Sequence, residues 1–156
     1  MVVRRWLVRG ILAVSAILMA RPTAAGGPYQ FYPITPCRLV DTRGAVGTNG
    51  GPALVSWTTR NFQVNQLCGV PLTAQSVALN AAVLSPSAPG FLTVWPYSPT
   101  WTWPGTSNIN VVAGVSIANG CLVGLTTGSL NISAIYGSGQ SSDHTDLIID
   151  VTGYYQ

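Results

Sequence analysis

The fold class of this chain is set by one stretch near its middle, Gln75-Ser76-Val77-Ala78-Leu79-Asn80-Ala81-Ala82-Val83-Leu84. Successive side chains of a β-strand point to opposite faces of a sheet. One face of this stretch would carry Val77, Leu79, Ala81 and Val83, and the opposite face is also mostly apolar. Because strands that are apolar on both faces are typical of the interior of a sheet, we expect a central strand here.

Short runs rich in β-branched residues occur on both sides of this stretch, and Gly, Pro or Asn separates them. The further candidate strands are Arg38–Thr42, Leu54–Val64, Phe91–Pro96, Asn108–Val112, Cys121–Leu125, Ser129–Tyr136 and Asp146–Tyr154. No segment after residue 26 has the period of an amphipathic helix. The pattern therefore predicts an all-β fold, a single antiparallel β-sandwich of jelly-roll or immunoglobulin-like type with about eight strands.

The N-terminal residues have the features of an export signal. A positive start is followed by a short apolar run over Gly10–Ala20 and by small residues before Gly26. The apolar run is shorter than the roughly 20 residues that a membrane-spanning helix needs. We expect residues 1–25 to be a signal peptide, by the general or the twin-arginine route. Residues 26–156 would form one secreted or cell-surface domain without a membrane span.

Charge is scarce beyond this leader. The chain has seven basic and four acidic residues, and all are arginine or aspartate. Four of the arginines lie in the leader, so the formal net charge of +3 for the whole chain becomes −1 for residues 26–156. A weakly acidic domain lacks the electrostatic basis for binding a phosphate backbone. We therefore expect no nucleic-acid partner.

Nearly all of the remaining charge lies in two motifs near the ends of the domain, Cys37-Arg38-Leu39-Val40-Asp41-Thr42-Arg43 and Asp143-His144-Thr145-Asp146-Leu147-Ile148-Ile149-Asp150. If the terminal strands pair, Asp41 and Asp150 approach as the paired carboxylates of a glycosidase do. A neighbouring arginine would lower their pKa values, which is wrong for a general acid. We expect structural ion pairs instead, formed by Arg38, Asp41, Arg43 and Asp150. If they are deeply buried, removing one partner would cost about 3–5 kcal/mol.

The sequence contains few candidate residues for catalysis or for binding a metal. His144 is the only histidine, and no convincing nucleophile motif occurs. Asp143, His144 and Asp146 could bind a cation such as calcium, but their spacing matches no recognised calcium loop. We expect solvated loop residues there, no catalytic residue, no metal site and no cofactor.

Three cysteines leave one without an intramolecular partner. Cys37 with Cys68 is the preferred pair, because it ties the first charged motif to the loop before Val70 and Pro71. It would close a loop of about 30 residues and contribute roughly 3–4 kcal/mol. Cys121 lies in an apolar run, where a buried thiol is expected, although a bond to another chain stays open.

The stretch Trp95-Pro96-Tyr97-Ser98-Pro99-Thr100-Trp101-Thr102-Trp103-Pro104-Gly105 is the strongest functional signal. Four large aromatic residues, Trp95, Tyr97, Trp101 and Trp103, are separated by Pro, Ser and Thr in what we predict is a loop. Exposed flat rings bury much area against sugars or proteins at low entropic cost. The loop would bind a glycan, contact a protein, or fold back and cap one end of the sandwich.

The segment Pro36–Arg43 resembles the opening of a family of secreted bacterial β-rich domains. Cys68–Pro71 with Ala74–Asn80 is similar to the middle of that family, and Asp146–Tyr155 is similar to its end. The resemblance extends over residues 32–155 and implies export, a β-sandwich, a Cys37–Cys68 disulfide and no established enzymatic activity. The chain departs from the family pattern at Ile117-Ala118-Asn119-Gly120 and in the aromatic loop.

These features predict a secreted, non-catalytic module that binds extracellular or cell-wall polysaccharide through the aromatic loop. The alternative is a self-assembling subunit of a surface layer or filament. In that case Gly26–Pro33 would lie on the sheet edge of a neighbour. The expected partners are therefore a polysaccharide, a neighbouring surface protein or a second copy of the chain.

Overall fold

The computed structural model describes residues 28–100, 102–126 and 131–156, and these residues contain strands but no helix. The all-β sandwich predicted from the sequence is confirmed. Within the described ranges, no helix is long and apolar enough to cross a membrane. The signal peptide predicted for residues 1–25 lies outside the described residues.

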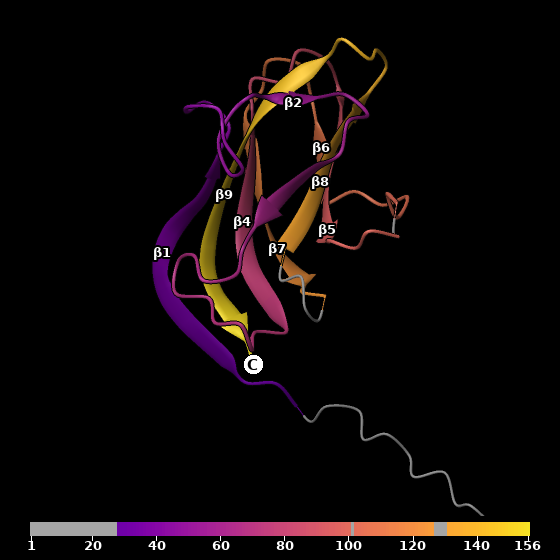
Figure 1. Cartoon of the computed structure of the whole chain (residues 1–156). Coiled ribbons are helices and arrows are strands. Elements are labelled where there is room, and N and C mark those ends of the chain that lie inside the picture. The colour runs from indigo at the N-terminus through magenta and orange to yellow at the C-terminus, as the bar shows by residue number, and fades with distance from the viewer. Residues whose placement is uncertain (1–27, 101, 127–130) are drawn as a thin grey trace, which may run out of the picture.

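Two antiparallel sheets pack face to face (Figure 1). The first sheet has the order β1 (Phe31–Asp41), β9 (His144–Tyr155), β4 (Ser76–Leu84) and β7 (Ile117–Gly124), and β2 (Leu54–Val55) pairs with one end of β9. The second sheet has the order β3 (Arg60–Gln63), β8 (Asn131–Ser138), β5 (Gly90–Pro96) and β6 (Ile109–Val111). The first and last strands of the domain are therefore neighbours in one sheet.

The central strand predicted from residues 75–84 is β4, which lies between β9 and β7. Val77, Leu79, Ala81 and Val83 are buried against the second sheet, whereas the alternate residues are half-buried on the outer face. Strict alternation of burial follows from the two-residue period of a strand. Its outer face carries Ala78 and Ala82 beside Ser76, Asn80 and Leu84, and all five side chains are half-buried.

The segment 54–64 and the first strand differ most from the sequence prediction. The strand expected over residues 54–64 is divided into β2 and β3, which belong to different sheets. The chain passes from one sheet to the other through a turn that contains Trp57, whose φ is 61°. β1 begins at Phe31, earlier than expected, and Phe31 to Pro33 pair with β9 of the same chain. These residues are therefore not a free arm that could reach a neighbour.

The core between the sheets is formed by aliphatic side chains around two aromatic ones. Phe62 and Tyr136 are fully buried, and the Tyr136 hydroxyl donates a hydrogen bond of 2.6 Å to the Ala88 carbonyl. This bond removes the cost of burying a hydroxyl without a partner. Each large apolar side chain buried here contributes about 1.5–3 kcal/mol, so the core supplies the main stabilisation of the sandwich.

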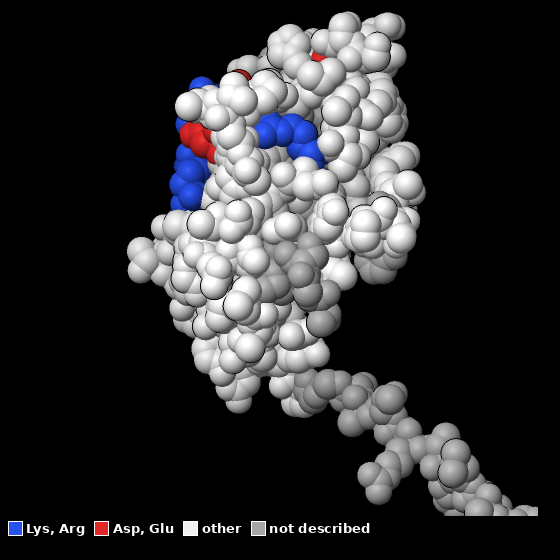
Figure 2. All heavy atoms as spheres, viewed as in Figure 1, with Lys and Arg blue, Asp and Glu red and all other residues white. Residues whose placement is uncertain are grey.

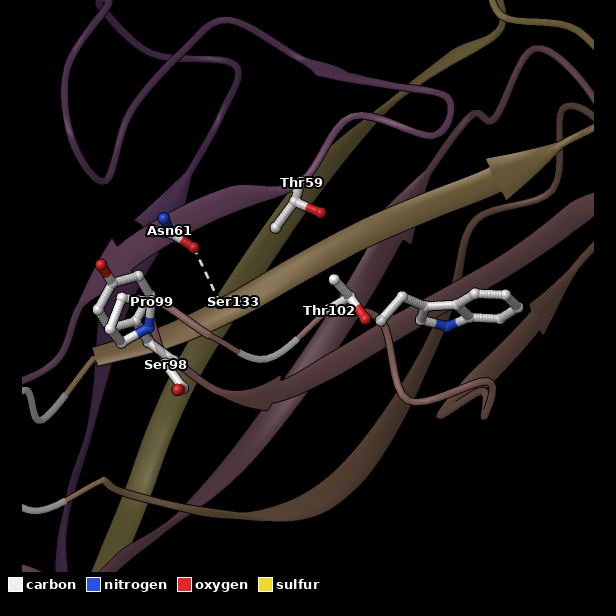
Figure 3. Close-up of a pocket in the computed structure, with 8 residues that line it drawn as sticks. Thr59, Asn61, Ser98, Pro99, Thr102 and Ser133 are labelled. Atoms are coloured by element: carbon white, nitrogen blue, oxygen red, sulfur yellow. Dashed lines mark hydrogen bonds between the residues drawn. The ribbon is translucent and has the colours of Figure 1, made fainter.

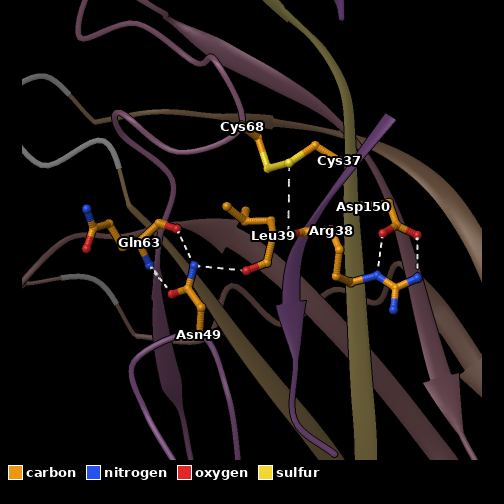
Figure 4. The surroundings of a disulfide bond; sticks show 7 residues. All are labelled: Cys37, Arg38, Leu39, Asn49, Gln63, Cys68 and Asp150. Carbon is orange, nitrogen blue, oxygen red and sulfur yellow. Dashed lines mark hydrogen bonds and ion pairs between the residues drawn. A yellow bond between two sulfur atoms is a disulfide. The ribbon is translucent and has the colours of Figure 1, made fainter. Parts of the chain in front are cut away.

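The predicted disulfide joins Cys37 in β1 to Cys68 in the loop after β3, with a distance of 5.6 Å between the two Cα atoms (Figure 4). It therefore connects an edge strand of the first sheet to a loop that leaves the second sheet. Asn49 lies beside it and bonds the carbonyls of Leu39 and Gln63 at 3.0 and 2.8 Å. Cys121 is half-buried in β7 and carries a free thiol, and burial raises its pKa.

Candidate functional site

The outer face of the second sheet is covered by the loop that follows β5. Thr93 and Ile135 point outward from this sheet, yet they are only 1% and 4% exposed. The Trp103 indole N–H donates to Thr93 Oγ1 and to the Thr106 carbonyl, each at 3.1 Å. Asn108 Oδ1 accepts a bond of 2.7 Å from the Val94 N–H. The loop therefore folds back along β5 rather than capping one end of the sandwich.

A groove of about 390 Å³ remains open between this loop and the sheet (Figure 3). This volume is in the range of small-molecule sites in proteins. Among the described residues, eight line it: Thr59, Asn61, Tyr97, Ser98, Pro99, Thr102, Trp103 and Ser133. Ser98 and Pro99 lie on one side, near Asn61, and Thr102 lies on the other. We call this feature the loop groove.

The floor of the loop groove is a cross-strand pair. Asn61 in β3 is directly opposite Ser133 in β8, and the Ser133 hydroxyl donates a bond of 2.8 Å to Asn61 Oδ1. This bond fixes the carboxamide, whose NH₂ group keeps its two donors. The floor therefore presents oriented polar groups, while Tyr97, Pro99 and Trp103 supply apolar surface.

A cluster of three aromatic rings adjoins the groove, and we call it the aromatic platform. Phe91 stacks on Trp103 with 5.2 Å between ring centroids, and Trp57 makes edge contacts with both at 5.6 and 5.5 Å. A Cβ on Gly137 would lie 2.3 Å from the Phe91 ring, so only glycine lets this ring lie on β8. The indole N–H of Trp57 donates a hydrogen bond of 2.8 Å to the Ser138 carbonyl. The rings are therefore held in place before any ligand binds.

The structure places the four predicted aromatic residues differently. Tyr97 and Trp103 line the loop groove, and Trp101 lies outside the described residues. Trp95 is a correction: it belongs to β5 and is 6% exposed, so it offers no surface to a ligand. Its position in an outward-facing but covered row of the sheet explains why the polar, proline-rich context misled the prediction.

Sequence reasoning missed Trp57, Phe91 and Asn61. Trp57 and Asn61 precede the loop by more than thirty residues, and only the pairing of β3 with β8 and of β8 with β5 brings them beside it. The one local signal was Trp57 itself, a large aromatic residue between Ser56 and Thr58 in an otherwise alternating run. Neither its φ nor its neighbours follow from that pattern.

The charged motifs meet at a distance from the groove, along the edge formed by β1 and β9. Arg38 bridges Asp150 and Asp41, with its Nε 2.5 Å from Asp150 Oδ1 and its Nη1 3.3 Å from Asp41 Oδ2. Arg43 contacts Asp41 Oδ2 at 2.7 Å. Figure 2 shows these charges gathered at one end of the visible face, most of which is uncharged.

These ion pairs lie nearer the surface than the sequence suggested. The side chains of Arg38 and Asp150 are 47% and 25% exposed, so the cost of 3–5 kcal/mol expected for deep burial does not apply. Hydrogen bonds from Arg43 hold the pKa of Asp41 well below its usual range. Asp41 therefore stays ionised and cannot act as a general acid near neutral pH.

Arg60, the basic residue outside both motifs, has a structural role. Its guanidinium donates to the carbonyls of Pro52 and Gly50, and it lies 4.9 Å from the centre of the Phe62 ring. Burial lowers its pKa. Arg60 thereby holds the loop between β1 and β2 against β3.

The residues considered for a cation are used by the turn between β8 and β9. Asp143 accepts bonds from the Ser138 hydroxyl at 2.7 Å and from the Gln140 N–H at 3.0 Å. Asp146 accepts a bond of 2.8 Å from the Thr42 hydroxyl, and His144 is exposed. Among the described residues, no group of three or more His, Cys, Asp or Glu side chains is placed to hold a metal.

No protein-family model matches the chain, and no curated protein is similar to it. None of the described residues that line the loop groove carries a carboxylate, an imidazole or a thiol. Its described lining combines aromatic rings with hydroxyl and carboxamide groups.

Proposed function

We propose that this domain is a secreted, non-catalytic module that binds extracellular or cell-wall polysaccharide in the loop groove. The observation that carries the proposal is the lining: aromatic side chains beside a row of neutral hydrogen-bonding groups, without a charged side chain. A pyranose ring has an apolar face and a rim of hydroxyl groups, and this lining is complementary to both.

Two physical terms support such binding. The faces of Tyr97 and Trp103 offer flat apolar area with few rotatable bonds to immobilise. Asn61, Thr59 and Ser133 offer donors and acceptors in fixed positions on the strands and at the start of β3. Because these groups are already oriented, a sugar that bonds to them does not have to order them first.

The experiment is retention of the purified mature protein on a panel of insoluble neutral polysaccharides, such as cellulose, chitin and mannan. We expect retention on at least one polymer, and about a tenfold loss of affinity for Trp103→Ala and for Asn61→Ala. Leu122→Ala is the matched control, because Leu122 is 62% exposed but belongs to the other sheet. No retention on any polymer, or equal retention of all variants, would overturn the proposal.

A second candidate function is a self-assembling structural subunit, and strand β7 favours it. β7 is an edge strand of the first sheet, and it contains neither a charged residue nor proline. Its Ile117 and Leu122 are 44% and 62% exposed. Uncharged edge strands readily pair with another chain.

Sizing of the mature protein at increasing concentration tests this second function. Growth of oligomers that Leu122→Lys abolishes would support a structural role through β7. A protein that stays monomeric at every concentration would overturn the structural role, and polysaccharide binding would remain as the proposed function.

A further inference from the structure

We infer that the loop groove and the aromatic platform form one continuous site, which binds several consecutive sugars of an extended neutral polysaccharide rather than a single sugar. The inference rests on the proposed function and specifies its ligand. It makes a distinct claim about length: the groove holds one part of the chain, and the platform holds the next part.

Trp103 makes the two features continuous. It lines the loop groove, and its ring also stacks on Phe91 and meets the edge of Trp57. A sugar that leaves the groove over Trp103 therefore encounters further aromatic surface rather than solvent.

The strand β8 gives the length of the site. Ser133, Ile135 and Gly137 face outward from β8, and they lie opposite Trp95, Thr93 and Phe91 of β5. Ser133 is in the floor of the groove, and Gly137 lies under the Phe91 ring of the platform. The four-residue separation corresponds to about 13 Å of strand, which exceeds the width of one pyranose ring.

Trp57 at the platform end is held in a conformation that few side chains adopt. Its φ is 61°, in the left-handed region that residues other than glycine adopt only at an energetic cost. Two hydrogen bonds of 2.8 Å maintain it, from its backbone N–H to the Tyr136 carbonyl and from its indole to the Ser138 carbonyl. Despite this anchoring, Trp57 is 51% exposed. Strain of this kind concentrates at binding sites, and here it presents an indole beside the groove.

The charge of the site defines the class of polymer. The eight residues of the groove and the three of the platform include no charged side chain. A uronic acid or a phosphorylated sugar would lose its hydration there without gaining a cationic partner. The site therefore fits neutral hexose or N-acetylhexosamine chains, and its affinity should not depend on salt.

Titration calorimetry with linear neutral oligosaccharides of increasing length tests the inference. The probes are cello-, chito- and manno-oligosaccharides from disaccharide to octasaccharide, with oligogalacturonates as acidic controls. We expect affinity for one neutral series to rise with length and then level off. Trp57→Ala should remove about tenfold of affinity for the longer members and leave the disaccharide unchanged, whereas Tyr97→Ala should weaken every length.

Two further variants keep the test decisive. Phe91→Ala removes a second ring of the platform and keeps Trp57 in the chain, so it should reproduce the length-specific loss. Leu122→Ala should bind like the unmodified protein at every length. Thermal unfolding of each variant establishes that it is folded under the conditions of the titration.

The outcomes separate the two claims. Absence of binding to all oligosaccharides and polymers would overturn the proposed function together with this inference. Binding that is equally strong for a disaccharide and an octasaccharide, or that Trp57→Ala and Phe91→Ala weaken equally at all lengths or at none, would overturn the continuous site alone. Tighter binding of oligogalacturonates than of every neutral series would overturn the assignment to neutral polymers.

Discussion

The two outer faces of this sandwich carry different kinds of side chain. The outer face of the first sheet carries the half-buried small side chains Ala78 and Ala82 of β4, with the exposed Leu122 of β7 beside them. The second sheet carries a folded loop, three packed aromatic rings and a polar groove. Both sheets bury similar aliphatic residues on their inner faces.

The difference shows which surface of the sandwich requires particular residues. Inner faces of a sandwich are interchangeable hydrophobic surfaces, and many sequences fill them. The outer face of the second sheet instead depends on particular residues, because a Cβ at position 137 would collide with the Phe91 ring and because Trp57 presents an indole that is 51% exposed. We expect substitutions on the two outer faces to have unequal effects, and four measurements test this expectation.

The largest effect should come from the disulfide, which couples the two sheets. Replacing Cys37 and Cys68 by Ala opens a loop with a sequence separation of 31 residues, and we expect a loss of about 3–4 kcal/mol of unfolding free energy. Chemical denaturation followed by tryptophan fluorescence and by far-ultraviolet circular dichroism measures it. Cys121→Ala is the control. Two separate transitions, one in fluorescence and one in dichroism, would show that the two sheets do not unfold together.

Matched glycine substitutions compare the faces directly. Gly137→Ala places a methyl group 2.3 Å from the Phe91 ring, whereas a Cβ on Gly120 of β7 meets only the Leu79 carbonyl, at 3.9 Å. We expect Gly137→Ala to lower stability by about 1–3 kcal/mol and to change the near-ultraviolet dichroism of the platform. Gly120→Ala should be neutral or slightly stabilising. Equal effects at the two sites would contradict the contrast between the faces.

A smaller effect is expected where charge lies on the first sheet. Asp150→Asn removes the ion pair with Arg38, and both side chains retain contact with water. Pairs of this kind contribute about 1 kcal/mol or less. Urea denaturation should detect that loss, and polysaccharide binding should not change. A loss of several kcal/mol would mean that the pair fastens the chain ends much more strongly than its exposure implies.

The smallest effect should be the pH dependence due to Asp41. Its pKa is lowered in the folded protein, mainly by hydrogen bonds from Arg43, so the folded state binds fewer protons than the unfolded state. The stabilisation is complete above the ordinary pKa of about 3.9 and is lost as the pH falls below it. Thermal unfolding from pH 7 to pH 2 should show a shallow decline that Asp41→Asn reduces. A decline of thermal stability above pH 5 would have to come from the titration of a group other than Asp41.

The sandwich and its central strand could be predicted because they depend on local alternation. Residues 75–84 have the two-residue period that appears as β4, and turn residues separate most of the other strands. The division of residues 54–64 could not be predicted, since Trp57 adopts a positive φ only because Tyr136 and Ser138 of another strand bind it.

The candidate site was only half predictable for the same reason. The density of aromatic residues after Phe91 marked the loop, and Tyr97 and Trp103 line the groove. No pattern distinguishes an outward position that a loop covers from one that it leaves open, so Trp95 was misplaced. Asn61 enters the site through its register opposite Ser133, which is a property of strand pairing.

The edge contact of Trp57 with Trp103 has an optical consequence. Two indole rings whose centroids lie 5.5 Å apart and whose planes meet at 75° couple their electronic transitions. Such coupling gives a paired band of opposite signs in the ultraviolet dichroism spectrum. A molecule that settles on either ring, or a shift of the loop that moves one of them, alters this band. The domain thus has an intrinsic spectroscopic signal that reports the binding of a ligand to these two rings.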